Sequence, residues 1–238
     1  MLPIKPLLLT LLLLLPVAAH PLPDSFEASY TLSTKGMVLG ETRYRMEPSP
    51  PLGESRFHFT THTQPTGLAA LMIDKVIDES STWGWHNNIL QPERYHYQQR
   101  GKREREREHI FDWQKQRVSL QEEGVTTVLE GLQPGTVDKA MFLLTLMHDL
   151  EQGKELLRYP LAKPGQWTHY LFKRGDHATI EVAAGRFEVQ LITRETTGKR
   201  SFRLWMAPAL HYLPIQIEYT EKDGKRFLLQ LKQTTLQD

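Results

Sequence analysis

Histidine is the residue type that most invites a metal site, because the chain contains ten of them. His58 and His62 share one face of an expected strand, but four residues of strand separate them by about 13 Å. His148 and Asp149 are adjacent, and on an expected helix their side chains point in different directions. A protein zinc site needs three or four converging ligands, so we expect no intrinsic metal.

The sequence offers even less support for acid–base catalysis. Asp138 and Asp149 would lie on one side of a helix about 16 Å apart, whereas paired catalytic carboxylates lie within about 10 Å of one another. The sequence contains no Gly-x-Ser-x-Gly elbow, phosphate loop or dinucleotide fingerprint. We therefore predict no catalytic residue and no cofactor, and we interpret Asp138 as a partner of the helix dipole.

A run of charges, "KRERERE", begins at Lys102 and is followed by Ile-Phe-Asp-Trp. As a strand, the segment places Arg103, Arg105 and Arg107 on one face with His109, Phe111 and Trp113, and a row of Glu on the other. A hairpin with an odd-numbered loop would bring Tyr95 and Tyr97 to the Arg face and His96 to the Glu row. The interleaved Glu row argues against nucleic-acid binding.

Two interpretations of the Arg row remain open. It is a charged hairpin tip that discourages edge-to-edge aggregation, or it is a contact surface for an anionic headgroup. A second candidate contact surface contains Trp205 and Tyr212, within the segment "WMAPALHYLP". Its alternative is a rigid proline-rich corner between two strands.

Strands must position these residues, because most of the chain alternates apolar and polar residues with a period of two. Turn signals at Lys35-Gly36, Glu123-Gly124, Gly175-Asp176 and Asp223-Gly224 predict eleven to thirteen short strands in an antiparallel meander. The apolar segment 66–73 is either one helical turn or a plug that caps the core. A sheet of this length must curl, so we predict a mainly β barrel or half-barrel.

One helix interrupts the strands, at about residues 137–152. Thr136 is its expected N-cap and Gly153 its expected C′ residue. A wide apolar stripe predicts that the helix packs on the inner face of the sheet. A ligand cavity between helix and sheet would then be lined by Met141, Leu144, Met147, Phe111 and Trp113.

The N-terminus has the pattern of a secretory signal peptide. Lys5 precedes an apolar run, and Val17-Ala18-Ala19 ends it with small residues. We therefore expect a signal peptide at 1–19, one β-rich domain at 20–238, a periplasmic location and no transmembrane span after cleavage. The absence of cysteine excludes disulfides and thiolate chemistry, and balanced charge argues against nucleic acid as a partner.

The order of several segments resembles an exported proteobacterial family, domain of unknown function 3108. The segments are "FEASYTLSTKGMVLGE", "ILQPERYHYQQRGK", "HIFDW", "TVDKAMFLLTLMHDLEQGK" and "WMAPALHYLPIQIEY". The resemblance implies a periplasmic β-rich protein and carries over no catalytic residue. The expected topology is also similar to the half-barrel of lipoprotein carriers, which is a likeness of shape alone.

Three functions are consistent with these observations. The first is a non-enzymatic protein that binds a lipid or another amphipathic envelope molecule between sheet and helix. The second is a structural or protein-interaction factor of the cell envelope with a fully packed core. The third is a hydrolase whose scattered residues form no recognisable motif.

Overall fold

The computed structural model describes residues 22–49, 56–87 and 89–236. Within them, fourteen strands form one antiparallel sheet in the order β8-β7-β6-β5-β4-β3-β2-β1-β14-β13-β12-β11-β10-β9. Strands that are neighbours in sequence pair with each other, except β8 and β9, which form the two edges of the sheet, and the first and last strands also pair. The expected signal peptide at 1–19 lies outside the described residues.

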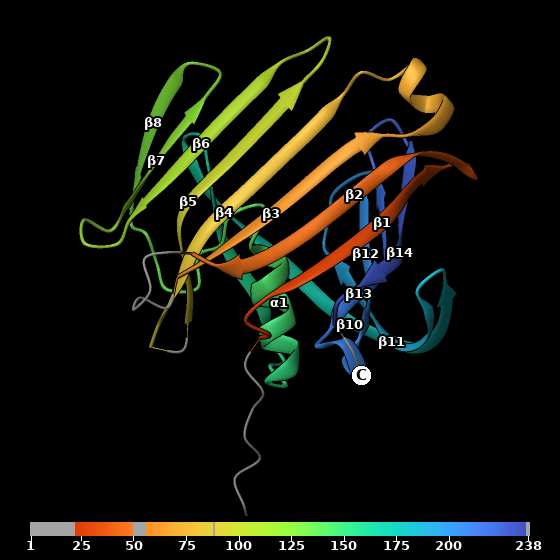
Figure 1. Cartoon of the computed structure of the whole chain (residues 1–238). Helices are drawn as coiled ribbons and strands as arrows, with labels where there is room; N and C mark the ends of the chain where they lie inside the picture. The colour runs from red at the N-terminus through yellow and green to blue at the C-terminus, as the bar shows by residue number, and fades with distance from the viewer. Residues whose placement is uncertain (1–21, 50–55, 88, 237–238) are drawn as a thin grey trace, which may run out of the picture.

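Figure 1 shows the curved sheet and the single short helix α1. The first half of the sheet contains β1 (Phe26–Thr34), β2 (Met37–Pro48), β3 (Arg56–Pro65), β4 (Val76–His86), β5 (Ile89–Arg100), β6 (Arg105–Asp112), β7 (Arg117–Glu122) and β8 (Val125–Glu130), with the 3₁₀ turn η1 (Gly67–Leu71) between β3 and β4. After α1 (Phe142–Glu151) come β9 (Leu157–Lys163), β10 (Gln166–Val182), β11 (Gly185–Arg194), β12 (Ser201–Ala207), the 3₁₀ turn η2 (Pro208–Leu210), β13 (Leu213–Thr220) and β14 (Arg226–Thr234).

The sheet is barrel-like and nearly closed, which confirms the predicted mainly β class. Its two edge strands, β8 and β9, are joined indirectly by the segment that follows β8. Trp167 Nε1 donates a hydrogen bond of 2.8 Å to the carbonyl oxygen of Glu130, and Val137 forms an isolated parallel bridge with Leu161. These contacts bring the two halves of the sheet together without continuous strand pairing.

Short turns with a left-handed backbone set the register, as the sequence predicts. Lys35 and Gly36 have φ of 48° and 78°, and Glu123 and Gly124 have φ of 52° and 83°. Both pairs therefore suit two-residue hairpin turns. The hairpin at Asp223-Gly224 is confirmed too, with a five-residue loop between β13 and β14.

The prediction of a turn at Gly175-Asp176 is wrong, because β10 continues through these residues as a single strand of 17 residues. The pairing with β11 shifts between Arg174 and His177 instead. A Cβ on Gly175 would lie 3.3 Å from the Leu191 side chain, so glycine allows close packing at a bulge here.

Two further differences between the predicted and the observed fold have simple causes. Strand β9 adds to the expected count because its residues are buried almost continuously and show no alternation. The plug interpretation of segment 66–73 is wrong, since η1 contains no buried residue.

The α1 helix begins five residues later than expected. Asp138 accepts hydrogen bonds of 2.8 Å from the backbone N–H groups of Ala140 and Met141, which holds 138–141 in a turn ahead of the helix. Gly153 follows the helix with φ of 69°, as expected for C′. Among the described residues, α1 is far too short to cross a bilayer and no longer apolar helix occurs.

Candidate functional site

A cavity of about 420 Å³ lies between the start of α1 and strands from both halves of the sheet. Strands β1 to β4 form one wall, and strands β11 to β14 form the other. Its apolar lining includes Leu32, Tyr44, Phe59, Ile77, Phe142, Leu143, Phe202, Leu204, Ile217 and Leu229. Its size and lining are typical of a site for a small amphipathic molecule.

Small hydroxyl residues leave this space open. Thr42, Thr61 and Thr63 border the cavity from β2 and β3. Thr42 Oγ1 and Thr63 Oγ1 lie 2.9 Å apart and satisfy each other. All three positions present a short side chain where a larger apolar residue would fill the space, and the polar atoms of Thr42 and Thr63 are already hydrogen-bonded.

Charged side chains reach into the same cavity, so its lining is not uniformly apolar. Glu79 accepts a hydrogen bond of 2.6 Å from Tyr95 OH, and its burial raises the pKa of the carboxyl group. Burial lowers the pKa of Lys139, which also borders the cavity. An acidic and a basic side chain therefore both border an otherwise largely apolar space.

Arg194 supplies a further cation in the opposite wall. Its guanidinium lies 4.5 Å from the ring centroid of Tyr170 and 4.7 Å from that of Phe202. Two aromatic faces hold the guanidinium plane in place. Arg194 borders the cavity, as does Arg200, and a guanidinium is a group that pairs well with a carboxylate or phosphate.

A buried polar network supports the segment from which Lys139 projects. Ser81 Oγ donates a hydrogen bond of 2.5 Å to Asp138 Oδ2, and both residues are fully buried. Burial raises the pKa of Asp138 to about 7, although the Ser81 hydroxyl and two backbone N–H groups oppose that effect. No open route reaches this pair in the part of the chain that the structure describes, so we interpret it as a structural link.

Two residues of the Arg face of β6, Arg107 and His109, turn toward the interior. Tyr97 pairs with Arg107 and Tyr95 with His109, which confirms the odd-numbered loop. Arg107 Nε lies 3.2 Å from Glu122 Oε2, and its guanidinium lies 5.3 Å from the Tyr97 ring centroid. Burial lowers the pKa of His109 to about 4, although a hydrogen bond with Glu122 opposes the shift.

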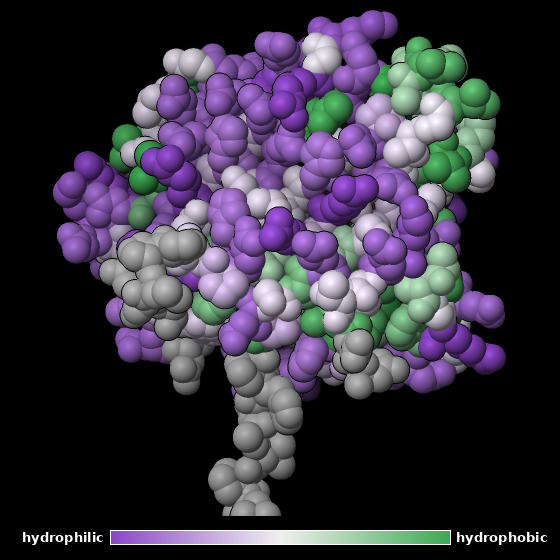
Figure 2. All heavy atoms as spheres, in the orientation of Figure 1, coloured by the Kyte–Doolittle hydropathy of each residue, from purple (hydrophilic) through white to green (hydrophobic). Residues whose placement is uncertain are grey.

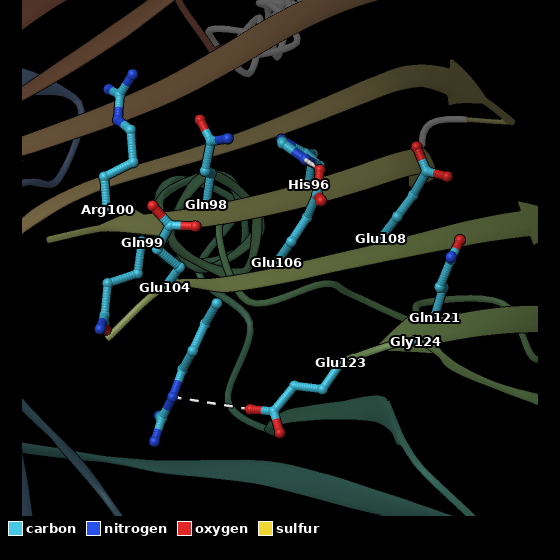
Figure 3. A pocket seen from close by; sticks show the side chains of 11 residues that line it. His96, Gln98, Gln99, Arg100, Glu104, Glu106, Glu108, Gln121, Glu123 and Gly124 are labelled. Carbon is cyan, nitrogen blue, oxygen red and sulfur yellow. Dashed lines mark hydrogen bonds and ion pairs between the residues drawn. The ribbon is translucent and has the colours of Figure 1, made fainter. Parts of the chain in front are cut away.

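The Glu row lies on the opposite, outer face, where it borders a larger open depression of about 680 Å³. Figure 3 shows the Glu side chains and His96 projecting from β5 and β6. His96 Nε2 lies 3.0 Å from Glu106 Oε1, and Arg105 Nε lies 3.7 Å from Glu123 Oε1. Exposed ion pairs of this kind contribute little energy, and the depression is lined almost entirely by polar and charged side chains. The interior cavity is the better candidate site.

The residues predicted to line a ligand cavity lie mainly in the core and do not border the cavity described above. Met141, Leu144 and Met147 are completely buried in the core, while the cavity is bordered by their neighbours Ala140, Phe142 and Leu143. Phe111 is buried as well, and Trp113 Nε1 donates a hydrogen bond of 2.8 Å to the carbonyl oxygen of Pro92.

The Arg row and the proline-rich corner also have definite positions. Arg103 is exposed at the β5–β6 turn, whereas Arg105 and Arg107 are half-buried. Trp205 and Tyr212 are half-buried on either side of η2, and Tyr212 has φ of 58°. The chain therefore makes a tight corner at this point.

The histidines engage separate partners. His62 Nδ1 lies 2.6 Å from Asp78 Oδ1, and His148 packs edge-on against Trp85 with ring centroids 5.0 Å apart. Asp149 accepts hydrogen bonds from Lys154 Nζ and Tyr159 OH. Within residues 22–49, 56–87 and 89–236, no three His or acidic side chains are grouped to hold a metal ion.

The fold and the cavity together define a class of protein: a barrel-like antiparallel sheet with a partly apolar cavity between its two halves. The chain belongs to the family described as protein of unknown function DUF3108, whose model matches residues 25–230. No curated protein matches the chain.

Two solved structures are similar to this one. The first is a beta-barrel-like protein of domain of unknown function DUF1849 from Brucella abortus, with 10% identity, a TM-score of 0.57 and coverage of 92% of this chain and 100% of that chain. The second is a protein with a YmcC-like fold from Bacteroides fragilis, with 9% identity, a TM-score of 0.36 and coverage of 90% of this chain and 97% of that chain. At such low identity, the first likeness supports the fold alone.

Proposed function

We propose that this protein is exported to the periplasm and binds an amphipathic, lipid-like molecule of the cell envelope in the cavity between sheet and helix. The single observation that carries the proposal is the cavity of about 420 Å³ itself. Protein interiors are normally packed to a high density, so a space of this size inside a barrel-like sheet is consistent with a binding site.

The placement of α1 supports this proposal. Phe142 lies parallel to Phe172, with ring centroids 6.0 Å apart, and edge-on to Tyr170 and Phe202. These partners come from β10 and β12, while His148 meets Trp85 of β4 on the other side. We infer that α1 lies on the concave face of the sheet and forms the floor of the cavity.

The lining specifies the chemical class of ligand. The aromatic and aliphatic walls suit an acyl chain or another flat apolar group. Arg194, held between Tyr170 and Phe202, provides a cation for an acidic headgroup. Glu79 and Lys139 provide additional hydrogen-bonding groups for polar substituents. An amphipathic molecule with a small acidic head therefore suits the site better than a sugar or a nucleotide.

A matched pair of tryptophan variants tests the proposal. Thr61→Trp places a large ring in the cavity, whereas Thr60→Trp places it on the other face of β3, beside His62 and Arg43. We expect Thr61→Trp to weaken binding of a fluorescent fatty acid by about tenfold or more, and Thr60→Trp to leave it unchanged.

Two results would count against the cavity as the binding site. One is unchanged fatty-acid binding by a folded Thr61→Trp protein, with folding checked by circular dichroism. The other is an absence of binding by the unaltered protein to fatty acids, lysolipids and phospholipids alike. Location is tested separately, by fractionating cells and determining the N-terminal residue of the mature chain.

A further inference from the structure

An exposed group of apolar side chains projects from one end of the barrel. It contains Met37 and Val38 from the start of β2 together with Leu68, Leu71 and Met72 from η1 and the residue after it, and we call it the apolar tip. Leu68, Leu71 and Met72 are 84%, 84% and 86% exposed. Figure 2 shows the hydrophobic side chains gathered at the upper right, over η1.

Backbone hydrogen bonds hold the apolar tip in shape. The N–H of Thr66 donates to the carbonyl oxygen of Leu39 at 3.2 Å, which ties η1 to β2. The N–H groups of Met72 and Ile73 both donate to the carbonyl oxygen of Ala69, at 3.0 and 2.8 Å. The large side chains are therefore held outward by an ordered turn, at the cost of leaving apolar surface in water.

Basic residues surround the apolar tip. Lys35 precedes Met37 in the β1–β2 turn, Lys75 follows η1, and Lys102 and Arg103 occupy the β5–β6 turn, all of them exposed. The β5–β6 turn is adjacent, since the backbone N–H of Lys102 donates a hydrogen bond of 3.1 Å to Asp74 Oδ2.

The local charge is positive although the chain as a whole is close to neutral. The four basic residues face two acidic ones in these turns, Asp74 and Glu104, which leaves a local excess of two positive charges (4 − 2). The Asp74 carboxylate is already engaged by the Lys102 N–H. The surroundings of the apolar tip are therefore complementary to a negatively charged surface.

We propose that the apolar tip and its basic surround dock the protein onto a membrane surface that carries anionic lipids. Projecting Leu and Met side chains insert between lipid headgroups, and nearby Lys and Arg side chains are attracted to the negative surface. A stable protein partner normally needs a complementary area of about 800 Å² on each side. A small convex tip suits a deformable lipid surface better than a second folded protein.

The position of the apolar tip relates it to the cavity. Thr63 and Ile77, which pair across β3 and β4, border the cavity a few residues from η1 on either side. Docking at the tip therefore places the cavity close to the lipid surface. Docking itself does not require that the cavity hold a ligand, so the two proposals can fail independently.

The test is co-sedimentation of the mature chain with vesicles. We expect binding to vesicles of phosphatidylethanolamine with phosphatidylglycerol, much weaker binding to vesicles of phosphatidylcholine alone, and loss of binding at high salt as the charges are screened. Leu68→Ser combined with Leu71→Ser should reduce binding by about tenfold or more.

A control double variant removes two exposed apolar groups elsewhere on the surface. Leu156 is 72% exposed and lies beside Ile89 and Leu90, away from η1, and Val128 of β8 is 48% exposed. Leu156→Ser combined with Val128→Ser should leave vesicle binding unchanged, and so should Thr61→Trp. Charge reversal by Lys35→Glu with Lys75→Glu should weaken binding to anionic vesicles selectively.

Several outcomes would overturn the docking proposal. These are no binding of the unaltered protein to either vesicle, equal binding by the Leu68 and Leu71 double variant, or self-association through the tip in place of lipid binding. Because the tip is exposed, the double variant should retain the melting temperature of the unaltered protein, so unfolding would not explain its loss of binding.

Discussion

The two parts of the barrel interior differ in how completely they are filled. Around the body of α1, Leu144, Met147 and Leu150 are fully buried. Around the first turn of α1, Phe142 and Leu143 border the cavity. The same short helix therefore belongs to a packed core along most of its length and to an open site at its start.

The inward side chains of the neighbouring strands explain the difference. In the packed part, Phe57 stacks on Trp83 at 4.7 Å, and Trp83 meets Trp85 edge-on at 5.8 Å. In the open part, Thr61 and Thr63 of β3 take the inward positions. Aromatic residues of β3 and β4 pack on one another in one part of the barrel, and short threonine side chains border the cavity in the other part.

The largest expected effect is the loss of packing at Leu144. Leu144→Ala should lower the free energy of unfolding by about 2–5 kcal/mol, because Leu144 is fully buried. Ile77→Ala, at a half-buried position beside the cavity, should cost about 1 kcal/mol. Urea denaturation of both variants measures the two losses of stability. Equal losses would contradict the difference between the packed part and the cavity part of the barrel.

The pH dependence of stability should depend on Asp138. Its folded pKa, about 7, lies above the ordinary value of 3.8. Stability from this group is therefore fully present below about pH 4 and is lost as the pH rises toward 7. Asp138→Asn removes this loss, so the stability of the variant relative to the unaltered protein should increase by about 3 kcal/mol between pH 5 and pH 8.

His109 provides an internal control for that measurement. Its folded pKa of about 4 lies below the ordinary value of 6.5, so its contribution is present above pH 6.5 and is lost as the pH falls through 4. Because both proteins contain His109, its effect cancels when the stability of the unaltered protein is subtracted from that of Asp138→Asn. A difference that stays constant across the pH range would mean that Asp138 is not shifted.

The smallest expected effect belongs to the apolar tip. Leu68→Ser with Leu71→Ser should change the free energy of unfolding by no more than about 0.5 kcal/mol, because neither side chain packs against the core. Urea denaturation alongside Leu144→Ala would show the contrast directly. A loss comparable to that of Leu144→Ala would mean that the tip covers core residues.

Much of the fold follows from local sequence signals. The Lys35-Gly36 and Glu123-Gly124 turns, the alternation along β6 and the placement of Tyr97 on the Arg face were all predictable, because turn chemistry and period-two patterning act over a few residues. Gly175 was misleading, since glycine permits both a turn and a bulge. Pro160 and continuous burial concealed β9, whose place depends on tertiary contacts.

The site was less predictable than the fold. The apolar stripe of α1 indicated a helix buried on several sides, but Met141, Leu144 and Met147 occupy filled core. The cavity depends on Thr61 and on Arg194, whose side chains meet only after distant strands are brought together. An inward threonine on a strand that otherwise carries aromatic residues was the one available signal.

The central claim, that the cavity holds an amphipathic molecule, is tested most directly by native mass spectrometry of the protein purified from cells without detergent. We predict an adduct of constant mass that organic solvent extracts as a lipid-like molecule, and that Thr61→Trp lacks while Thr60→Trp retains. A protein that carries no adduct, and that remains free of one after incubation with total envelope lipid, would contradict the claim.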